Sequence, residues 1–423
     1  MKSWVIPEEI HQYVGVLKYG SDGGMGNCSF PIGRQSMGYV AVKGGQDAIE
    51  NANELVEYYR LKEQAEPVRL DQIKAQFRLA IDRAMGEGSL YAPEHAALAV
   101  LQTEGDSFEA AFHLRAYRAT LKRRYYSEML NTREMFVLRR ISSTFREIPG
   151  GQILGPTRDY SLRLLNPALL QHTLGSIEQF LVRVRGSIDP AKLEGVRTFS
   201  KVVDLFVREG LMRPETGPGH NRRVFDVTRE AIKFPVPRSA VLQMLARGET
   251  GGLMCMAYST MRGFGVSHGT IGELRVGDVA VRLKDARGRV RYAGKIRVTE
   301  CEMVGGEGRR SVPKAGKKKG APYLSVGYGL CFGQNETKAI CMGMLESGMR
   351  NPDPNSPANS QEFVLYHTEC VEAYGFTNHL KLPHYVTFQS GLSNLRKVVQ
   401  AMKKEPVGVT AGSASTSEGY DRE

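Results

Sequence analysis

Lys295–Val304 reads KIRVTECEMV, and this stretch most directly decides the expected fold. It is rich in β-branched and hydrophobic residues, which are frequent in strands. A shorter run of the same kind, VAVRL, begins at Val279, and glycines punctuate the sequence around both runs. The C-terminal part of the chain is therefore predicted to contain an antiparallel sheet.

The sequence before these strands has a different period. Apolar residues recur every four positions from residue 73 to residue 85, which predicts an amphipathic helix with one apolar face, formed by Ile73, Phe77, Ile81 and Met85. Pro93 is suited to begin the next helix. The predicted fold class is α+β, with a helical N-terminal half followed by a mixed domain that holds the antiparallel sheet.

The 423 residues are more than one core usually holds, so several parts are expected. Residues 1–36 read as an extension of doubtful structure, either dispensable or the result of a misassigned start. Residues 37–233 form a mainly helical domain, and residues 234–403 form the mixed domain. Residues 404–423 are too polar to fold and are expected to be a disordered tail.

Composition narrows the class of protein. Hydrophobic residues make up 41% of the chain, and no stretch approaches the roughly 20 apolar residues of a membrane span. The N-terminus lacks the apolar core of a signal peptide, so a cytoplasmic protein without a membrane partner is expected. The six cysteines form no C-x-x-C pair and are interpreted as buried thiols. The net charge of +12 suits polyanions, but no recognised nucleic-acid motif accompanies it, and nucleic acid is not expected as a partner.

Glu300 and Glu302 in the segment TECEM are the candidate catalytic residues. In a strand, residues two apart face the same side, roughly 6–7 Å from one another. Such a carboxylate pair could stabilise a developing sugar cation and transfer a proton. A polar sheet face is the alternative, and it is the more common arrangement.

Three cations are candidates for binding an anionic substrate. Lys43 lies in VAVKGG and Arg262 in YSTMRGFG, and in both segments backbone amides of a glycine-rich turn could cradle a phosphate. Arg158 lies beside Asp159 in Ile148–Asn166, IPGGQILGPTRDYSLRLLN, a segment rich in residues that end helices and strands. Ordinary turns explain these glycines equally well.

His379–Tyr385, HLKLPHY, holds two histidines five residues apart. Neither a helix nor a flat strand brings His379 and His384 together, so the backbone must turn between them, which Pro383 favours. Two imidazoles suit zinc, although a further ligand is needed, and His367 and Cys370 are the nearby possibilities. Two structural histidines in a turn are the alternative.

Several long motifs occur in one order along the chain: MGYVAVKGGQDAIENA, IPGGQILGPTRDY, LMCMAYSTMRGFG, TECEMV, GYGLCFGQNETKAICMGMLE, EFVLYHTECVEAYGF and HLKLPHYVTFQ. Together they closely resemble the PhnI subunits of bacterial carbon–phosphorus lyase core complexes. The resemblance covers most of the chain from Met37 to about Lys403. Cys370 is not part of the family pattern, so it is dropped as a ligand.

The resemblance implies a function in phosphonate catabolism. PhnI-like subunits work with PhnG, PhnH and PhnL to displace adenine from MgATP with a phosphonate, which yields ribose 1-phosphonate 5-triphosphate. Alone they resemble purine nucleosidases, and in the hetero-oligomeric core complex they pair with PhnJ. The family's two histidines bind zinc, which assigns this role to His379 and His384. A non-catalytic, zinc-binding scaffold subunit of the same assembly is the alternative.

The reaction demands the residue types found above, although the resemblance assigns no role to them. Charge that develops on the ribose calls for a carboxylate, here Glu300 or Glu302. The triphosphate and the phosphonate call for cations, here Lys43, Arg158 and Arg262.

Overall fold

The structure of the protein is a computed structural model that describes residues 45–63, 66–188, 199–212, 224–264, 269–284, 287–306, 324–350, 353–382 and 385–404. Its contacts divide the chain into two compact units. One is Glu66–Tyr374, and the other combines Met1–Ala65 with Gly375–Glu423. The larger unit holds the whole sheet and most of the helices.

The larger unit begins with four helices, whose bounds are α2 (Leu70–Gln76), α3 (Arg78–Gly88), α4 (Pro93–Gln102) and α5 (Ser107–Thr120). Small and aliphatic side chains close their core, among them Ala84, Ala96 and Ala110, which are fully buried. Pro93 is the first residue of α4, as predicted. Asp106 caps α5 by accepting hydrogen bonds from the backbone N–H groups of Phe108 and Glu109.

Four antiparallel strands form one sheet in the order β1 (Phe136–Ile141), β2 (Thr270–Lys284), β3 (Val290–Gly306) and β4 (Leu324–Phe332). Both predicted runs lie in it, VAVRL in β2 and KIRVTECEMV in β3. The predicted α+β class is confirmed. Strand β1 comes from before residue 234, so both predicted domains contribute strands to this sheet, and the domain division stays a prediction.

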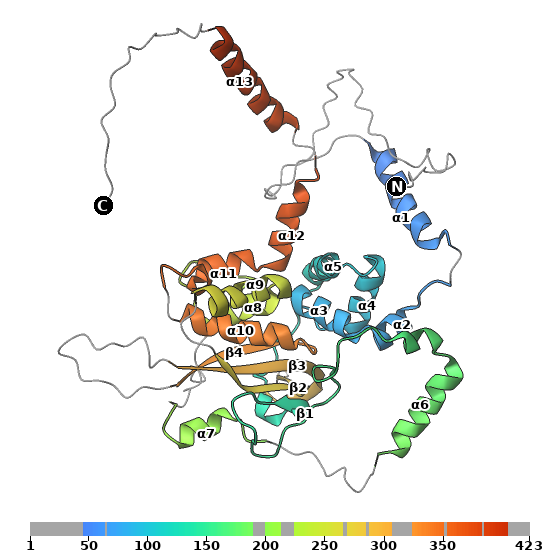
Figure 1. The fold of residues 1–423 in the computed structure, drawn as a ribbon, viewed down its shortest axis with the longest axis vertical. Coiled ribbons are helices and arrows are strands. Elements are labelled where there is room, and N and C mark those ends of the chain that lie inside the picture. The colour runs from blue at the N-terminus through green and yellow to red at the C-terminus, as the bar shows by residue number, and fades with distance from the viewer. Residues whose placement is uncertain are drawn as a thin grey trace, which may run out of the picture. The chain divides into compact units, whose positions relative to one another are not determined.

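The helices that follow the first strand are α6 (Leu174–Gly186), α7 (Val203–Arg208), α8 (Arg238–Arg247), α9 (Thr250–Ser259), α10 (Glu336–Met349), α11 (Gln361–His367) and α12 (Cys370–His379). Helices α8 to α11 lie over one face of the sheet, with α10 nearest to it (Figure 1). In β3, Cys301 and Met303 face this layer and join its core. Val298 and Val304 belong to two smaller clusters with Met135 and with Phe206 of α7, because alternate residues of a strand face opposite sides.

Glycines bring helix α10 unusually close to strand β4. A Cβ atom on Gly327 would lie 1.8 Å from the carbonyl oxygen of Gly343, and one on Gly329 would lie 2.1 Å from that of Ala339. The backbones of the strand and the helix therefore touch directly. This contact fixes where the first turn of α10 lies.

One predicted helix and one predicted cysteine differ from what the structure shows. The apolar repeat from Ile73 to Met85 is not one helix, because Phe77 (φ −110°, ψ 36°) separates α2 from α3 and its side chain is 58% exposed. This residue contributes no contact to the core that Ile73, Ile81 and Met85 share. The cysteine prediction holds for Cys301, Cys331, Cys341 and Cys370, whereas Cys255 is exposed on α9.

The smaller unit contributes α1 (Gln46–Leu61), the end of α12 and α13 (Tyr385–Lys404). Apolar residues of α13 recur at alternating steps of four and three, at Phe388, Leu392, Leu395, Val399 and Met402. Each helix in the described part of the chain is too short or too polar to span a lipid bilayer. The predicted extension 1–36 lies outside the described residues, as do residues 307–323. Of the predicted tail 404–423, only Lys404 is described, and it is the last residue of α13.

Candidate active site

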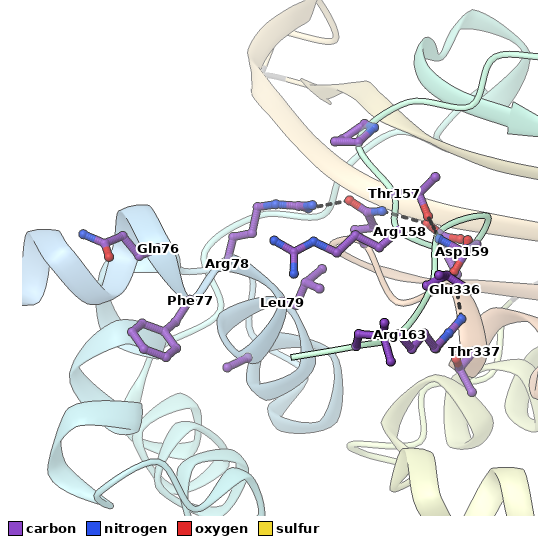
Figure 2. Close-up of a pocket in the computed structure, with 15 residues that line it drawn as sticks. Gln76, Phe77, Arg78, Leu79, Thr157, Arg158, Asp159, Arg163, Glu336 and Thr337 are labelled. Atoms are coloured by element: carbon purple, nitrogen blue, oxygen red, sulfur yellow. Dashed lines mark hydrogen bonds and ion pairs between the residues drawn. The ribbon is translucent and has the colours of Figure 1, made fainter. Parts of the chain in front are cut away.

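A cavity of about 980 Å³ opens in the larger unit. Its walls are the start of α3 with the residues before it (Gln76–Ala80), the loop of residues 156–164, and the start of α10 at Gln334, Glu336 and Thr337. The volume is at the upper end of the range of small-molecule sites, roughly 300–1,000 Å³. Segments more than 250 residues apart in sequence meet here (Figure 2).

Three arginines give the cavity its cationic character. Figure 2 shows Arg78 and Arg158 extending into the cavity from different walls. Arg78 donates a hydrogen bond to the neutral amide of Gln334, and no described carboxylate pairs with Arg78 or Arg158. Arg163 is weakly paired, with its Nη2 atom 3.5 Å from Oδ1 of Asp159. The cavity thus holds positive charge that the described residues do not fully neutralise.

Two helix starts add to this preference for anions. The first turns of α3 and α10 both line the cavity. The N-cap residues are Phe77 and Asn335, and neither makes a capping hydrogen bond from its side chain. Helix starts present backbone N–H groups and partial positive charge, which suit phosphate and carboxylate oxygens.

Two carboxylates occupy the wall between the loop and α10. Asp159 accepts a hydrogen bond from Nη2 of Arg139 at 2.5 Å, and Oε2 of Glu336 lies 3.0 Å from Nε of the same arginine. The side chain of Arg139 is 1% exposed and also donates to the carbonyl oxygen of Leu154 at 2.5 Å. One buried guanidinium therefore sets the positions of both carboxylates.

The turn before α10 is held in place by a hydrogen bond to Asp82 of α3. Its carboxylate accepts from the backbone N–H of Gln334 at 2.9 Å, and burial raises its pKa. Gly333 has a φ of +70°, and a Cβ there would lie 2.4 Å from Asp82. Only glycine combines that conformation with that approach. The α10 wall of the cavity is thus a constrained structure.

The predicted catalytic pair lies elsewhere, in the interior. Glu300 and Glu302 face the same side of β3, as predicted, and are 1% and 6% exposed. The Nζ atom of Lys201 lies 2.8 Å from Glu300 and 2.6 Å from Glu302. Glu300 also accepts hydrogen bonds from Arg275, from the hydroxyl of Thr132 at 2.7 Å and from that of Tyr328 at 2.8 Å. We call this group the buried carboxylate cluster.

The two acids of the cluster differ in their partners and in their pKa values. Burial alone would raise the pKa of Glu300, but Arg275 and Lys201 outweigh it and hold the pKa at about 2. Burial raises the pKa of Glu302 to about 7, with a contribution from the charge of Glu300. The Oε2 atom of Glu302 is buried and lacks a hydrogen-bond partner among the described residues. Glu302 is therefore the member of the pair that can carry a proton near neutral pH.

The structure describes two of the other predicted site residues, Arg262 and His379. Arg262 is exposed in a π-helical turn, Thr260–Phe264, and does not line it. Lys43 and His384 lie outside the described residues. His379 ends α12, and its Nδ1 atom contacts the carbonyl oxygen of Phe376. Of the four residues predicted for catalysis or substrate binding that the structure describes, Arg158 alone lines the cavity.

The described residues contain no cluster of three potential metal ligands. His367, considered as a third ligand, ends α11 and packs its ring against Phe363, with 4.3 Å between ring centroids. His379 does satisfy one requirement of a metal ligand. A carbonyl oxygen can only accept, so Nδ1 carries the hydrogen in this contact, as it does in histidines that bind a metal through Nε2.

Sequence reasoning missed Arg78 and Glu336 in the cavity, the buried Arg139 that pairs with its carboxylates, and Lys201 and Arg275 in the buried carboxylate cluster. One signal was present. Phe136–Ile141 reads FVLRRI, and two arginines inside an apolar strand indicate buried charges that need carboxylate partners. The partners themselves come from distant segments, which no local pattern identifies.

Comparison with known proteins identifies relatives over most of the chain. The family described as bacterial phosphonate metabolism protein (PhnI) matches residues 38–402. A candidate C-P lyase subunit protein of Stutzerimonas stutzeri, HtxH, is 45% identical over 88% of this chain and 98% of its own length. The alpha-D-ribose 1-methylphosphonate 5-triphosphate synthase subunits PhnI of Rhizobium meliloti and Escherichia coli are 42% and 41% identical, over 88% and 86% of this chain and 97% and 98% of their own lengths.

Proposed function

This chain belongs to the PhnI family of bacterial phosphonate metabolism proteins, and from that premise we propose that its arginine-lined cavity is where ATP exchanges adenine for a phosphonate. The bond between the anomeric carbon of the ribose and the adenine nitrogen breaks, and a bond from that carbon to a phosphonate oxygen forms. Adenine leaves with a proton. The other product is ribose 1-phosphonate 5-triphosphate.

The observation that carries this proposal is the unneutralised positive charge of the cavity. Arg78 and Arg158 reach into it without a described carboxylate partner, and the first turns of α3 and α10 face it without side-chain caps. Guanidinium groups and helix starts are the groups that bind phosphate oxygens best. A triphosphate and a phosphonate together supply the negative charge that this arrangement lacks.

The carboxylates beside these cations could stabilise the positive charge that the reaction creates on the ribose. Positive charge develops on the ribose as adenine leaves, and a nearby carboxylate stabilises it. Asp159 and Glu336 line the cavity, and Arg139 holds them in place. Glu300 and Glu302 remain predicted catalytic residues, but their burial and their ion pairs favour Asp159 for the role.

The partners and the metal extend the proposal. We propose that the chain acts with PhnG, PhnH and PhnL and pairs with PhnJ, and that alone it releases adenine from MgATP as a purine nucleosidase. His379 and His384 would hold the zinc, which as a Lewis acid could polarise a bound oxygen. The contact of Nδ1 of His379 with a backbone carbonyl fits a histidine that binds a metal through Nε2.

The test is reconstitution with these partner subunits, ATP and methylphosphonate, followed by phosphorus NMR of the products. Arg158→Ala should lower product formation about tenfold or more, since a charge-assisted hydrogen bond to phosphate is worth roughly 1.5–3 kcal/mol. Lys284→Ala is the matched control, because Lys284 is an exposed cation at the end of β2, outside the cavity. Equal activities of the two variants would remove the cavity from the reaction.

The scaffold alternative gives a different result in the same assay. His379→Ala and His384→Ala should each strip zinc from the complex, which metal analysis measures. If the complex stays assembled and active after zinc loss, the histidines do not serve catalysis. If it dissociates while the isolated chain still releases adenine from ATP, zinc supports assembly and the chain remains an enzyme.

A further inference from the structure

A second cavity, of about 520 Å³, shares the loop of residues 156–164 through Tyr160. It is lined by residues 146–148, by Gly151 and Gln152, and by Leu154 and Tyr160. Asp159 lines the first cavity and Tyr160 the second, so consecutive residues face the two spaces. We propose that the second cavity binds the purine base of the nucleotide whose triphosphate occupies the first, with Tyr160 as the stacking platform. This inference rests on the proposed function.

The lining of the second cavity differs in chemistry from that of the first. Tyr160 and Leu154 are 66% and 52% exposed, so a ligand in the cavity could reach both side chains. Bases stack readily on exposed aromatic rings, and each such contact is worth roughly 1–3 kcal/mol. Arg146, Glu147 and Gln152 add polar side chains to the lining, and the amide of Gln152 already bonds to backbone groups of residues 142, 145 and 146.

The loop between the cavities is held firmly against strand β1. Arg140 and Ile153 exchange two backbone hydrogen bonds of 2.7 Å. Gly155 has a φ of +63°, and a Cβ there would lie 2.5 Å from the carbonyl oxygen of Leu138. These contacts anchor the segment just before Asp159 and Tyr160 to the strand.

Arg139 contacts lining residues of both cavities. Its guanidinium pairs with Asp159 and Glu336 in the first cavity and lies 6.0 Å from the centre of the Tyr160 ring in the second. A base stacked on the opposite face of that ring would place the ribose at the boundary, next to Asp159. The bond between ribose and adenine would then lie beside Asp159, the carboxylate assigned to stabilise positive charge on the ribose.

The experiment compares ATP with inorganic tripolyphosphate, which carries the charge but no base. Binding of both to the purified full-length chain is measured by calorimetry for the wild type, Tyr160→Ala, Tyr160→Phe and Tyr125→Ala. Tyr125 is the matched control because its side chain is 67% exposed and lines neither cavity. Near-UV circular dichroism checks that each variant is folded.

Tyr160→Ala should weaken ATP binding about fivefold or more, as expected for the loss of ~1 kcal/mol or more of stacking, and should leave tripolyphosphate binding unchanged. Tyr160→Phe and Tyr125→Ala should bind both ligands like the wild type. Equal weakening of both ligands, or of neither, by Tyr160→Ala would overturn the base site.

The proposed function fails in a distinguishable way. If Arg158→Ala changes neither ligand's affinity while Tyr160→Ala weakens ATP alone, the base site stands and the triphosphate site does not. If tripolyphosphate binds and Arg158→Ala weakens it while Tyr160→Ala has no effect, only the base site is lost. A wild-type chain that binds neither ligand would overturn both.

Discussion

The larger unit contains two groups of carboxylates and cations that look alike in composition and differ in their surroundings. In the buried carboxylate cluster, Glu300 and Glu302 both form ion pairs with Lys201, and the two carboxylates are almost inaccessible to water. At the cavity, Asp159 and Glu336 share Arg139, but one side of each faces open space. The comparison teaches that residue types alone do not identify a catalytic site. A carboxylate that is fully buried with its cation suits a structural role, whereas one that is exposed on one side can also contact a substrate.

The largest expected effect comes from breaking the buried cluster at its shared cation. Lys201→Met would leave two carboxylates buried with only part of their compensation, and removing one partner of a buried pair costs roughly 3–5 kcal/mol. Urea unfolding should show this loss. Lys295→Met is the control, since Lys295 pairs with Asp278 at 2.8 Å but is 65% exposed, and its loss should not measurably change stability. Similar stabilities for the two variants would show that the cluster is not structural.

The next largest effect is a loss of catalytic activity when the carboxylates at the cavity are changed. Asp159→Asn should lower adenine release about 10²-fold if the carboxylate stabilises charge on the ribose. Its effect on stability should be small, because an amide oxygen can still accept from Arg139, and Glu336 remains. Adenine release is followed by chromatography, alongside urea unfolding. An active Asp159→Asn chain would return attention to Glu300 and Glu302.

A smaller effect is expected on the pH dependence of the free energy of unfolding, which should differ between Glu300 and Glu302. The folded pKa of Glu302 is about 7, above its ordinary value of 4.5, so its contribution to stability is complete below pH 4.5 and is lost as pH rises through 7. Relative to Glu302→Gln, the wild type should lose unfolding free energy over this window, at up to about 1.4 kcal/mol per pH unit.

Glu300 should behave in the opposite way, which makes it the control for the same titration. Its folded pKa of about 2 is below the ordinary value, so its contribution is present above pH 4.5 and is lost as pH falls toward 2. Parallel pH profiles for Glu300→Gln and Glu302→Gln would show that the two carboxylates do not differ as described.

The smallest effect is expected away from both groups, at the turn between β3 and β4. Gly306 pairs with Leu324, so the strand ends are adjacent where residues 307–323 connect them. Replacing residues 307–323 with Asn-Gly should close a two-residue hairpin. The melting temperature should change little, and scanning calorimetry would measure it. A drop as large as that of Lys201→Met would give this segment a structural role.

The sequence predicted the elements with a clear period and missed those set by distant contacts. The strands around VAVRL and KIRVTECEMV and the shared face of Glu300 and Glu302 follow from local pattern, and they were found. The break at Phe77 was not, because a four-residue repeat cannot show that one member stays out of the core. Arg158 was singled out, but Arg78 and Glu336, which join it at the cavity, lie in segments that only the fold brings together.

The direct contact between β4 and α10 limits how this protein can vary. Gly327 and Gly329 leave no space for even a methyl group, since the helix backbone begins where their Cβ atoms would be. An amino-acid substitution at either position would therefore move the start of α10, and with it Glu336 and Thr337, while leaving every residue of the cavity chemically intact. In a mutational scan such positions would mimic active-site residues. Their loss of activity would come from displacement, and no change of pH, metal or substrate concentration should rescue it.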